Sequence, residues 1–380
     1  MKKSMLALAA LTAFAGAASA QSSVTIWGIV DATYAIGNGS LTDRTQVTNS
    51  GYNSSRLGFR GVEDMGGGNR AGFWLEAALA NDNGAGGATN TNNQASGGAI
   101  AGIGGGQGLT FARRSTVSWG GNWGELRLGR DYTPHFWNHT VYDPFGTNGV
   151  GTSQLLNSSL GGSTTVRASN SIAYIFGQNF NGNSLGPGKG VHAFVQYYLG
   201  ENNTGTGTPA TRNDGKGFSF RVGYDAGPLS VALASGKTKY AQTATAGNIR
   251  SMNLGGSYSL PVAKISAEWS KDSVASSAGS IAGKGYLLGA NVPMGTNEIR
   301  FAVSNYKIEG PGTAFDGKAN KFALGYVANL SKRTALYATY ARVSNSGAST
   351  QALNGATVVA NGAVGDRNST GMDFGIRHSF

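Results

Sequence analysis

Side chains that could carry covalent chemistry are scarce in this 380-residue chain. Cysteine is absent and only four histidines occur, so thiolate nucleophiles, disulfides and cysteine metal sites are excluded. His135 and His139 have the i, i+4 spacing of a metal pair, but we read their Pro- and aromatic-rich segment as a loop rather than a helix, and no third ligand is evident. Ser235–Thr238 resembles the end of a phosphate loop, but Val231 occupies the required upstream glycine position. We therefore expect no catalytic residue, no metal and no cofactor.

Arginines set among apolar residues are the more informative charged groups. Arg56 and Arg60 flank Leu57 and Phe59, and Arg127 stands between two leucines. Because successive side chains of a strand point to opposite faces, these arginines share a face that is separate from the apolar one. Guanidinium groups gathered inside a low-dielectric wall raise the local concentration of anions.

The elements that would position these arginines are strands. In residues 217–225, 251–260, 263–270 and 321–330, apolar or aromatic residues alternate with small, polar or charged ones. Short connections alternate with long polar ones, which we place at 37–52, 81–108, 132–165, 200–215, 240–248, 271–283, 309–319 and 345–367. This pattern predicts an all-β fold, an antiparallel up-and-down barrel that crosses the outer membrane with lipid-facing and lumen-facing residues in alternation.

Sixteen strands are predicted, an even number that puts both termini of the chain on the short-turn side. We place them at 23–36, 53–64, 69–80, 110–119, 124–131, 166–177, 190–199, 217–225, 228–239, 249–260, 263–270, 284–293, 297–308, 320–330, 333–344 and 368–380. A soluble sandwich or propeller would also show many short strands. The length of these strands, their repeated polar face and the absence of a blade-sized repeat favour the membrane barrel.

The two ends of the chain support the same interpretation. Lys2 and Lys3, an apolar run and Ala18-Ser19-Ala20 make residues 1–20 a cleaved signal peptide, which leaves 21–380 as a single barrel domain. The last strand alternates to its final residue, Phe380, and would leave a sticky edge unless it pairs with the first strand. We therefore expect Asp373 and Arg377 to face the lumen and the apolar residues to face lipid.

Several strings together resemble the trimeric general porins of the Gram-negative outer membrane, in particular their β-proteobacterial branch. These strings are SVTIWGIVD at 23–31, SRLGFRGVEDMGGG at 55–68, AGFWLE at 71–76, RRSTVSWGGNWGELRLGRD at 113–131, ALGYVANLSKRTALYATY at 323–340 and GIRHSF at 375–380. The resemblance implies a homotrimer in outer-membrane lipid that passes small hydrophilic solutes. It also implies a third long loop, about 132–165, that folds into the lumen, and a C-terminal Phe380 read by the barrel assembly machinery.

The same resemblance assigns a pore arginine cluster. Arg113 and Arg114 are adjacent, so a regular strand turns one inward and one outward, and periodicity alone leaves both choices open. The resemblance favours Arg113 as the inward residue and adds Arg56 and Arg167, with Arg60 and Arg130 as weaker members. An arginine facing lipid at mid-membrane would cost ~2–4 kcal/mol. We therefore expect Arg114 to lie near a membrane interface or against a neighbouring subunit.

Charge in the third long loop suggests which ions pass. In 132–165 the only acidic residue is Asp143, with Asp131 at the base of the loop, whereas the resemblance implies several acids opposite the arginines. The formal net charge of the chain is +11. We therefore expect a pore with anion preference, with Arg56, Arg60, Arg113, Arg127, Arg167, Asp131 and Asp143 at its constriction. The alternative is that the arginines only hydrogen-bond the loop in place.

Three other functions compete with a general diffusion pore. A substrate-selective channel for an organic anion, phosphate or sugar would need a continuous aromatic track through the lumen. An outer-membrane enzyme or adhesin would need an acidic or Ser/His cluster in the long loops, and none is legible. Nucleic-acid binding fits poorly with export and with dispersed basic residues.

Overall fold

The computed structural model describes residues 23–89, 93, 108–156, 160, 162–182, 190–202, 210–312, 316–359 and 367–380. The expected signal peptide at 1–20 lies outside these residues. Among the residues described, no helix has the length and hydropathy needed to cross a membrane.

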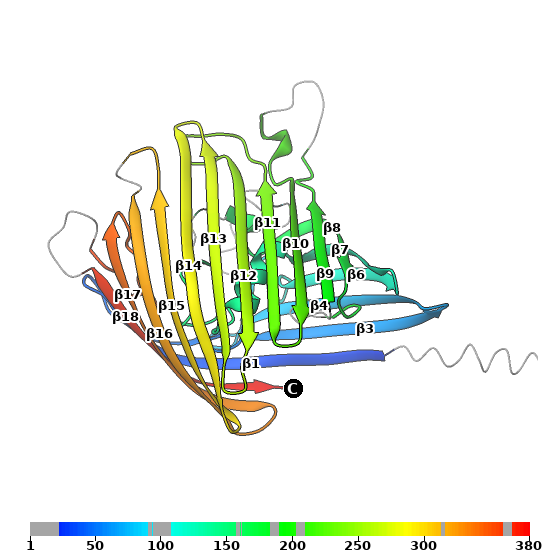
Figure 1. Ribbon diagram of the computed structural model, residues 1–380, viewed down its shortest axis with the longest axis horizontal. Coiled ribbons are helices and arrows are strands. Elements are labelled where there is room, and N and C mark those ends of the chain that lie inside the picture. The colour runs from blue at the N-terminus through cyan, green and yellow to red at the C-terminus, as the bar shows by residue number, and fades with distance from the viewer. Residues whose placement is uncertain are drawn as a thin grey trace, which may run out of the picture.

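Sixteen long strands among the described residues form one closed antiparallel barrel (Figure 1). They are β1 (Ser23–Asn38), β3 (Arg56–Gly66), β4 (Asn69–Ala80), β6 (Arg114–Gly121), β7 (Gly124–Tyr132), β8 (Arg167–Phe176), β9 (Gly190–Tyr198), β10 (Gly217–Ala226), β11 (Leu229–Thr238), β12 (Asn248–Ser259), β13 (Lys264–Ser276), β14 (Gly279–Met294), β15 (Asn297–Glu309), β16 (Gly317–Asn329), β17 (Thr334–Gly347) and β18 (Asn368–Ser379). Each overlaps one predicted strand, so the predicted fold class is confirmed. The short strands β2 (Arg44–Asn49) and β5 (Ala85–Gly86) lie in loop segments.

The barrel closes where its last strand meets its first. β18 pairs antiparallel with β1 from Thr370 opposite Asn38 to Ser379 opposite Ile29. The main chain of Phe380 adds two hydrogen bonds to Gly28, of 3.1 and 3.2 Å. In Figure 1 the blue and red strands accordingly run side by side. Closure leaves no open row of backbone donors and acceptors, which a bilayer could not satisfy.

Side chains alternate between a covered inner face and an open outer face. On β12, Ser251 and Asn253 point inward and are buried, whereas Met252 and Leu254 point outward and are exposed. β18 follows the same rule, because Asp373 is buried inside and Phe374 is exposed outside. An apolar outer face with a polar interior is the pattern of strands that face lipid on one side and water on the other.

The prediction of a long loop at 271–283 is wrong. β13 continues to Ser276 and β14 begins at Gly279, so the two strands form a tight hairpin. Here Val274 and Ile281 point inward, where they pack with Ile249 and with Leu160 of the β7–β8 connection. These apolar inward residues break the alternation of polar-inside and apolar-outside residues by which the strand ends were predicted.

Candidate functional site: the pore constriction

The wall of the barrel is interrupted between β2 and β3, and the chain there turns into the lumen. We call residues 50–55 the inward turn. Asp31 on β1 holds it, because Oδ2 of its carboxylate accepts the backbone N–H groups of Tyr52 at 2.9 Å and Asn53 at 2.6 Å. The backbone N–H of Asp31 donates to the hydroxyl of Ser55 at 2.9 Å. Tyr52 is thereby placed inside the barrel.

A second inward element is loop 3, the β7–β8 connection at 133–166, which begins with helix α2 (Pro134–Tyr142). The expectation of a loop without a helix is therefore wrong: proline stands at the helix start, where its fixed φ is compatible with helix and its missing N–H is not needed. Asn138 anchors the helix to the inner wall, donating to the carbonyl of Ala232 at 2.8 Å and accepting from Arg221 at 2.6 Å. Asn253 donates to the carbonyl of His135 at 2.9 Å.

Beyond the helix, loop 3 crosses the lumen to the opposite wall. The backbone N–H of Val150 donates to Asp373 on β18 at 2.7 Å, and that of Gln154 donates to Ser304 on β15 at 3.0 Å. Lys321 on β16 donates to the carbonyl of Thr152 at 2.7 Å. Polar inward side chains of distant strands therefore hold the loop across the barrel, as the resemblance implied.

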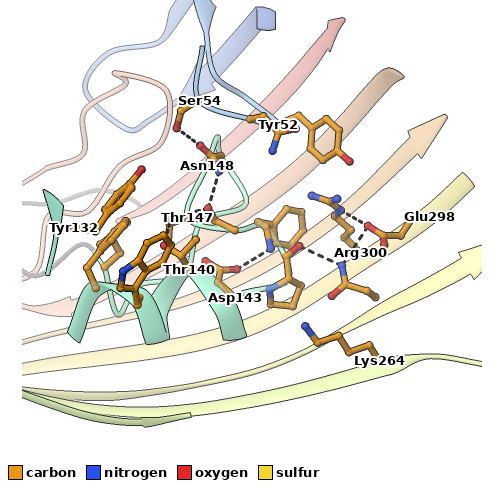
Figure 2. A pocket seen from close by; sticks show the side chains of 18 of the residues that line it. Tyr52, Ser54, Tyr132, Thr140, Asp143, Thr147, Asn148, Lys264, Glu298 and Arg300 are labelled. Carbon is orange, nitrogen blue, oxygen red and sulfur yellow. Dashed lines mark hydrogen bonds and ion pairs between the residues drawn. The ribbon is translucent and has the colours of Figure 1, made fainter. Parts of the chain in front are cut away.

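The two inward elements meet at the tip of loop 3. The hydroxyl of Ser54 donates to the amide oxygen of Asn148 at 2.7 Å. Gly149 has φ +61° and packs so closely on the inward turn that a Cβ there would lie 2.1 Å from the carbonyl oxygen of Gly51. Together the two elements narrow the lumen to a cavity of about 760 Å³ (Figure 2).

Three arginines converge at this cavity, from β3, from the residue before β6 and from the start of β8. Arg113 donates to Glu76 at 2.5 Å and to the hydroxyl of Tyr132 at 2.5 Å, and Arg56 lies 3.3 Å from the same carboxylate. The guanidinium of Arg167 stacks 4.2 Å from the centroid of the Tyr132 ring. All three line the cavity. One carboxylate for three guanidinium groups leaves the cluster with a net positive charge.

Two further basic residues, which were not among the predicted constriction residues, face the same cavity. Lys264 on β13 and Arg300 on β15 line it together with Glu298, whose carboxylate accepts from Arg300 at 2.5 Å. Figure 2 shows Arg300 beside Glu298 and near Tyr52, over whose ring its guanidinium lies at 4.4 Å. Both basic residues occupy the polar parity of their strands, and that parity was the available signal.

Asp143, the predicted acid of loop 3, lines the cavity but is occupied by its own loop. Its two carboxylate oxygens accept the backbone N–H groups of Phe145 and Ser153, each at 2.9 Å. Burial raises its pKa to about 6, although these hydrogen bonds oppose the shift. Asp143 therefore stabilises a turn and adds little negative charge to the pore in mildly acidic water.

Arg127 and Asp131 lie inside the barrel but do not line the cavity. Arg127 binds Glu125 at 2.8 Å and Asp131 at 2.7 Å, and both partners are buried. Arg114 joins this network at 3.6 Å from Asp131. Our expectation that Arg114 faces a membrane interface or a neighbouring subunit is therefore wrong. β6 begins only at Arg114, so Arg113 lies before the regular strand and both side chains turn inward.

The weaker members of the predicted cluster lie apart from the cavity as well. Arg60 is exposed and its guanidinium lies 5.2 Å from the ring of Trp74. Arg130 donates to the carbonyl of Ala112 and to the hydroxyl of Ser169, each at 2.7 Å. The structure thus brings Arg56, Arg113 and Arg167 together and does not bring Arg60 to them.

The two histidines of α2 have separate partners. His135 contacts the hydroxyl of Ser219 at 3.0 Å, whereas His139 lies 3.0 Å from the carboxylate of Glu268. Burial, and then the charge of His139, lowers the pKa of His135 to about 3. Burial also lowers the pKa of His139, but Glu268 outweighs it and the net shift is upward. The described residues contain no group of three metal-binding side chains around either imidazole.

A closed barrel with an apolar outer face, a polar interior and two inward elements around a charged cavity defines an outer-membrane channel. The profile of the Gram-negative porin family matches residues 7–348 of the chain. The chain belongs to this family, and it is an outer-membrane porin, not an enzyme.

Individual relatives agree with this assignment. The chain is 39% identical to outer membrane porin protein 32 of Delftia acidovorans and 28% identical to an outer membrane porin protein of Bordetella pertussis, with all of both chains covered in each case. The anion-selective porin from Comamonas acidovorans is similar in structure, with a TM-score of 0.77 and 35% identity over 95% of this chain and 100% of that one. The trimer form of OmpT of Vibrio cholerae shares the fold, with a TM-score of 0.63 and 13% identity over 94% of this chain and 99% of that one.

Proposed function

We propose that the chain forms a general diffusion pore with anion preference, through which small anionic and neutral solutes pass. The observation that carries this proposal is the charge around the cavity. Among the described residues, five basic side chains line it against two acidic ones, and the basic ones are Arg56, Arg113, Arg167, Lys264 and Arg300. A low-dielectric wall around fixed guanidinium groups raises the local anion concentration and lowers that of cations.

The acidic side chains offset this charge only in part. Glu298 is bound to Arg300, and Asp143 is occupied by backbone N–H groups of loop 3. Glu76 lies behind Arg56 and Arg113, where it orients both guanidinium groups. The relative described as anion-selective, 35% identical in sequence, supports the same preference here.

We propose further that the pore works as a homotrimer. β1 carries exposed apolar side chains on its outer face, among them Val24 and Ile26, which are 67% and 63% exposed in the single chain. Such a wall suits packing against another subunit. The fold shared with a porin described in a trimer form supports this proposal.

Residues 1–20 would direct export and be removed. Phe380 would serve as the signal for the barrel assembly machinery. Nucleic acid is no partner in this scheme.

The experiment that tests the proposed function is planar-bilayer recording of the purified protein. We expect steady conductance, closure in three equal steps at high voltage and a reversal potential of the sign set by anions. Absence of steady pores would refute the porin function, whereas steady pores with cation preference would refute only the selectivity.

A further inference from the structure

The outer wall of the barrel carries a row of basic side chains that the pore does not use. They occupy one outward-facing position near the loop end of each strand from β11 to β17, the wall at the front of Figure 1, and all are exposed. We call them the basic ladder, which consists of Lys237, Arg250, Lys271, Lys284, Lys307, Lys318 and Arg342.

Strand register places most of these charges directly beside one another. Lys271 pairs with Lys284, Lys284 with Lys307, and Lys307 with Lys318. Like charges directly opposite each other on one face of a sheet are destabilising. Within the described residues, the only carboxylate within ion-pair distance of the ladder is that of Glu309, which binds Lys307 and lies 4.0 Å from Lys284. The ladder is therefore short of negative charge.

The ladder lies at the edge of the lipid-facing band. On β13, Lys271 follows the outward Trp269, and on β14, Lys284 is two residues from the outward Tyr286. Both aromatic side chains are exposed, at 41% and 56%. The long loops lie at this end of the barrel, together with the tight β13–β14 hairpin, and the other short turns lie at the opposite end. Since short turns face the periplasm in such barrels, the ladder stands at the headgroup level of the outer leaflet.

Surface hollows adjoin the ladder at Arg342. One has a volume of about 430 Å³ and is lined by polar residues that include Asn38 and Asn368. The other has about 390 Å³ and is lined by the aromatic residues Tyr286, Phe322 and Tyr340 together with polar residues such as Asn320 and Ser344. Both hollows adjoin Arg342 and leave room beside the ladder for part of a lipid molecule.

We propose that the basic ladder binds phosphate groups of the phosphorylated lipid in the outer leaflet. Neighbouring strands lie about 4.8 Å apart, so one phosphate can contact two ladder lysines and remove their mutual repulsion. Solutes in the lumen cannot reach this outward face. A second copy of the chain has no matching row of carboxylates on the outer face of its described strands.

The test is binding of lipid A, which carries two phosphates, to the detergent-solubilised full-length protein by native mass spectrometry. Lys271→Gln/Lys284→Gln should weaken binding about 30-fold, since each basic residue near an anionic surface contributes ~1 kcal/mol. Lys332→Gln/Arg333→Gln removes the same charge from the exposed short-turn rim and should leave the affinity unchanged. Lys271→Arg/Lys284→Arg should retain it.

Each other outcome overturns the proposal. Equal lipid A binding by the ladder variant and the wild type would show that the ladder is not the site. Competition by inorganic phosphate at the same concentration as lipid A would show a site for the free ion. Loss of trimers without loss of lipid A would assign the ladder to a contact between copies of the chain. Single-channel conductance should be unchanged in the ladder variant, which separates this test from that of the pore.

Discussion

Two adjacent arginines show how position decides what a charge does. The guanidinium of Arg113 lines the cavity, held by Glu76 and Tyr132, so it acts on passing ions. That of Arg114 packs 4.4 Å from the ring of Trp74 and lies in the buried network with Asp131. Only the first contributes to the field across the cavity, although the two residues have the same chemistry.

Arg113→Gln and Arg114→Gln form a matched pair that tests this difference. We expect Arg113→Gln to lower the anion-to-cation permeability ratio roughly two- to fivefold, because a unit charge within a few ångströms of an ion in water is worth about 1 kcal/mol. Arg114→Gln should leave the ratio unchanged and lower the thermal stability. Reversal potentials in a salt gradient measure the ratio. An equal effect of both variants would contradict the geometry.

Asp143 predicts how selectivity changes with pH. Burial raises its pKa to about 6, so its carboxyl becomes neutral as the pH falls from 7 to 5 and the cavity gains positive charge. The anion-to-cation permeability ratio should rise over that interval. The pKa of Asp143 in the folded state exceeds the usual 3.8. Its carboxyl group therefore makes its full contribution to the stability of the folded state below about pH 4. This contribution is lost as the pH rises through 6.

The measurement is the reversal potential of the wild type and of Asp143→Asn at pH 7 and pH 5. The variant should show no rise, since its side chain does not titrate. A rise of equal size in the variant would assign the pH dependence to another group.

At the scale of elements, the bore is set where two inward segments meet rather than by loop 3 alone. The inward turn is held by Asp31 and contacts loop 3 through Ser54 and Asn148. The guanidinium groups of Arg300 and Arg377 lie 4.4 and 5.1 Å from the centroid of the Tyr52 ring. The position of the loop tip therefore depends on the first strands of the barrel.

Ser54→Ala removes the side-chain hydrogen bond between the two segments. Its loss costs about 1 kcal/mol, so we expect more frequent brief closures and greater open-channel noise with nearly unchanged thermal stability. Ser259→Ala is the control, because Ser259 lines the same cavity and its hydroxyl makes no hydrogen bond within the described residues. Equal noise in the two variants would show that the bond does not restrain loop 3.

Alternation predicts the strands because lipid on one side and water on the other impose a two-residue period. It fails where the inner face is itself apolar, as at Val274 and Ile281, which pack beneath loop 3. It also fails at Arg114, because the start of a strand is set by tertiary contacts that no local pattern contains. Lys264 and Arg300 lie on the polar parity of their strands, but only the path of loop 3 shows that they share a cavity with Arg56.

At the scale of the whole molecule, closure rests on the last residue. Phe380 pairs through its main chain with Gly28, and its ring packs where a Cβ on Gly28 would lie 2.3 Å from its Cζ. Only glycine at position 28 leaves room for the Phe380 ring at the junction of β1 and β18. β1 pairs with β2 and β3 as well as with β18, so it joins the first strands of the barrel to the last one.

Deleting Phe380 should reduce the amount of folded protein in the outer membrane much more than the conductance of the channels that do form. The reason is that Phe380 does not line the cavity, whereas assembly requires closure and, as proposed, recognition of the C-terminal residue. Heat-modifiable mobility on gels measures folding, with Phe380→Tyr as a control that keeps an aromatic end. Normal assembly of the deletion variant would show that the ending is incidental.

We propose that the three arginines around the cavity set the ion preference of the pore, and the reversal potential under a salt gradient tests this assignment. We predict anion preference for the wild-type protein and little or no preference for Arg56→Gln/Arg113→Gln/Arg167→Gln with conductance retained. Cation preference in the wild type, or anion preference undiminished in the triple variant, would contradict the claim.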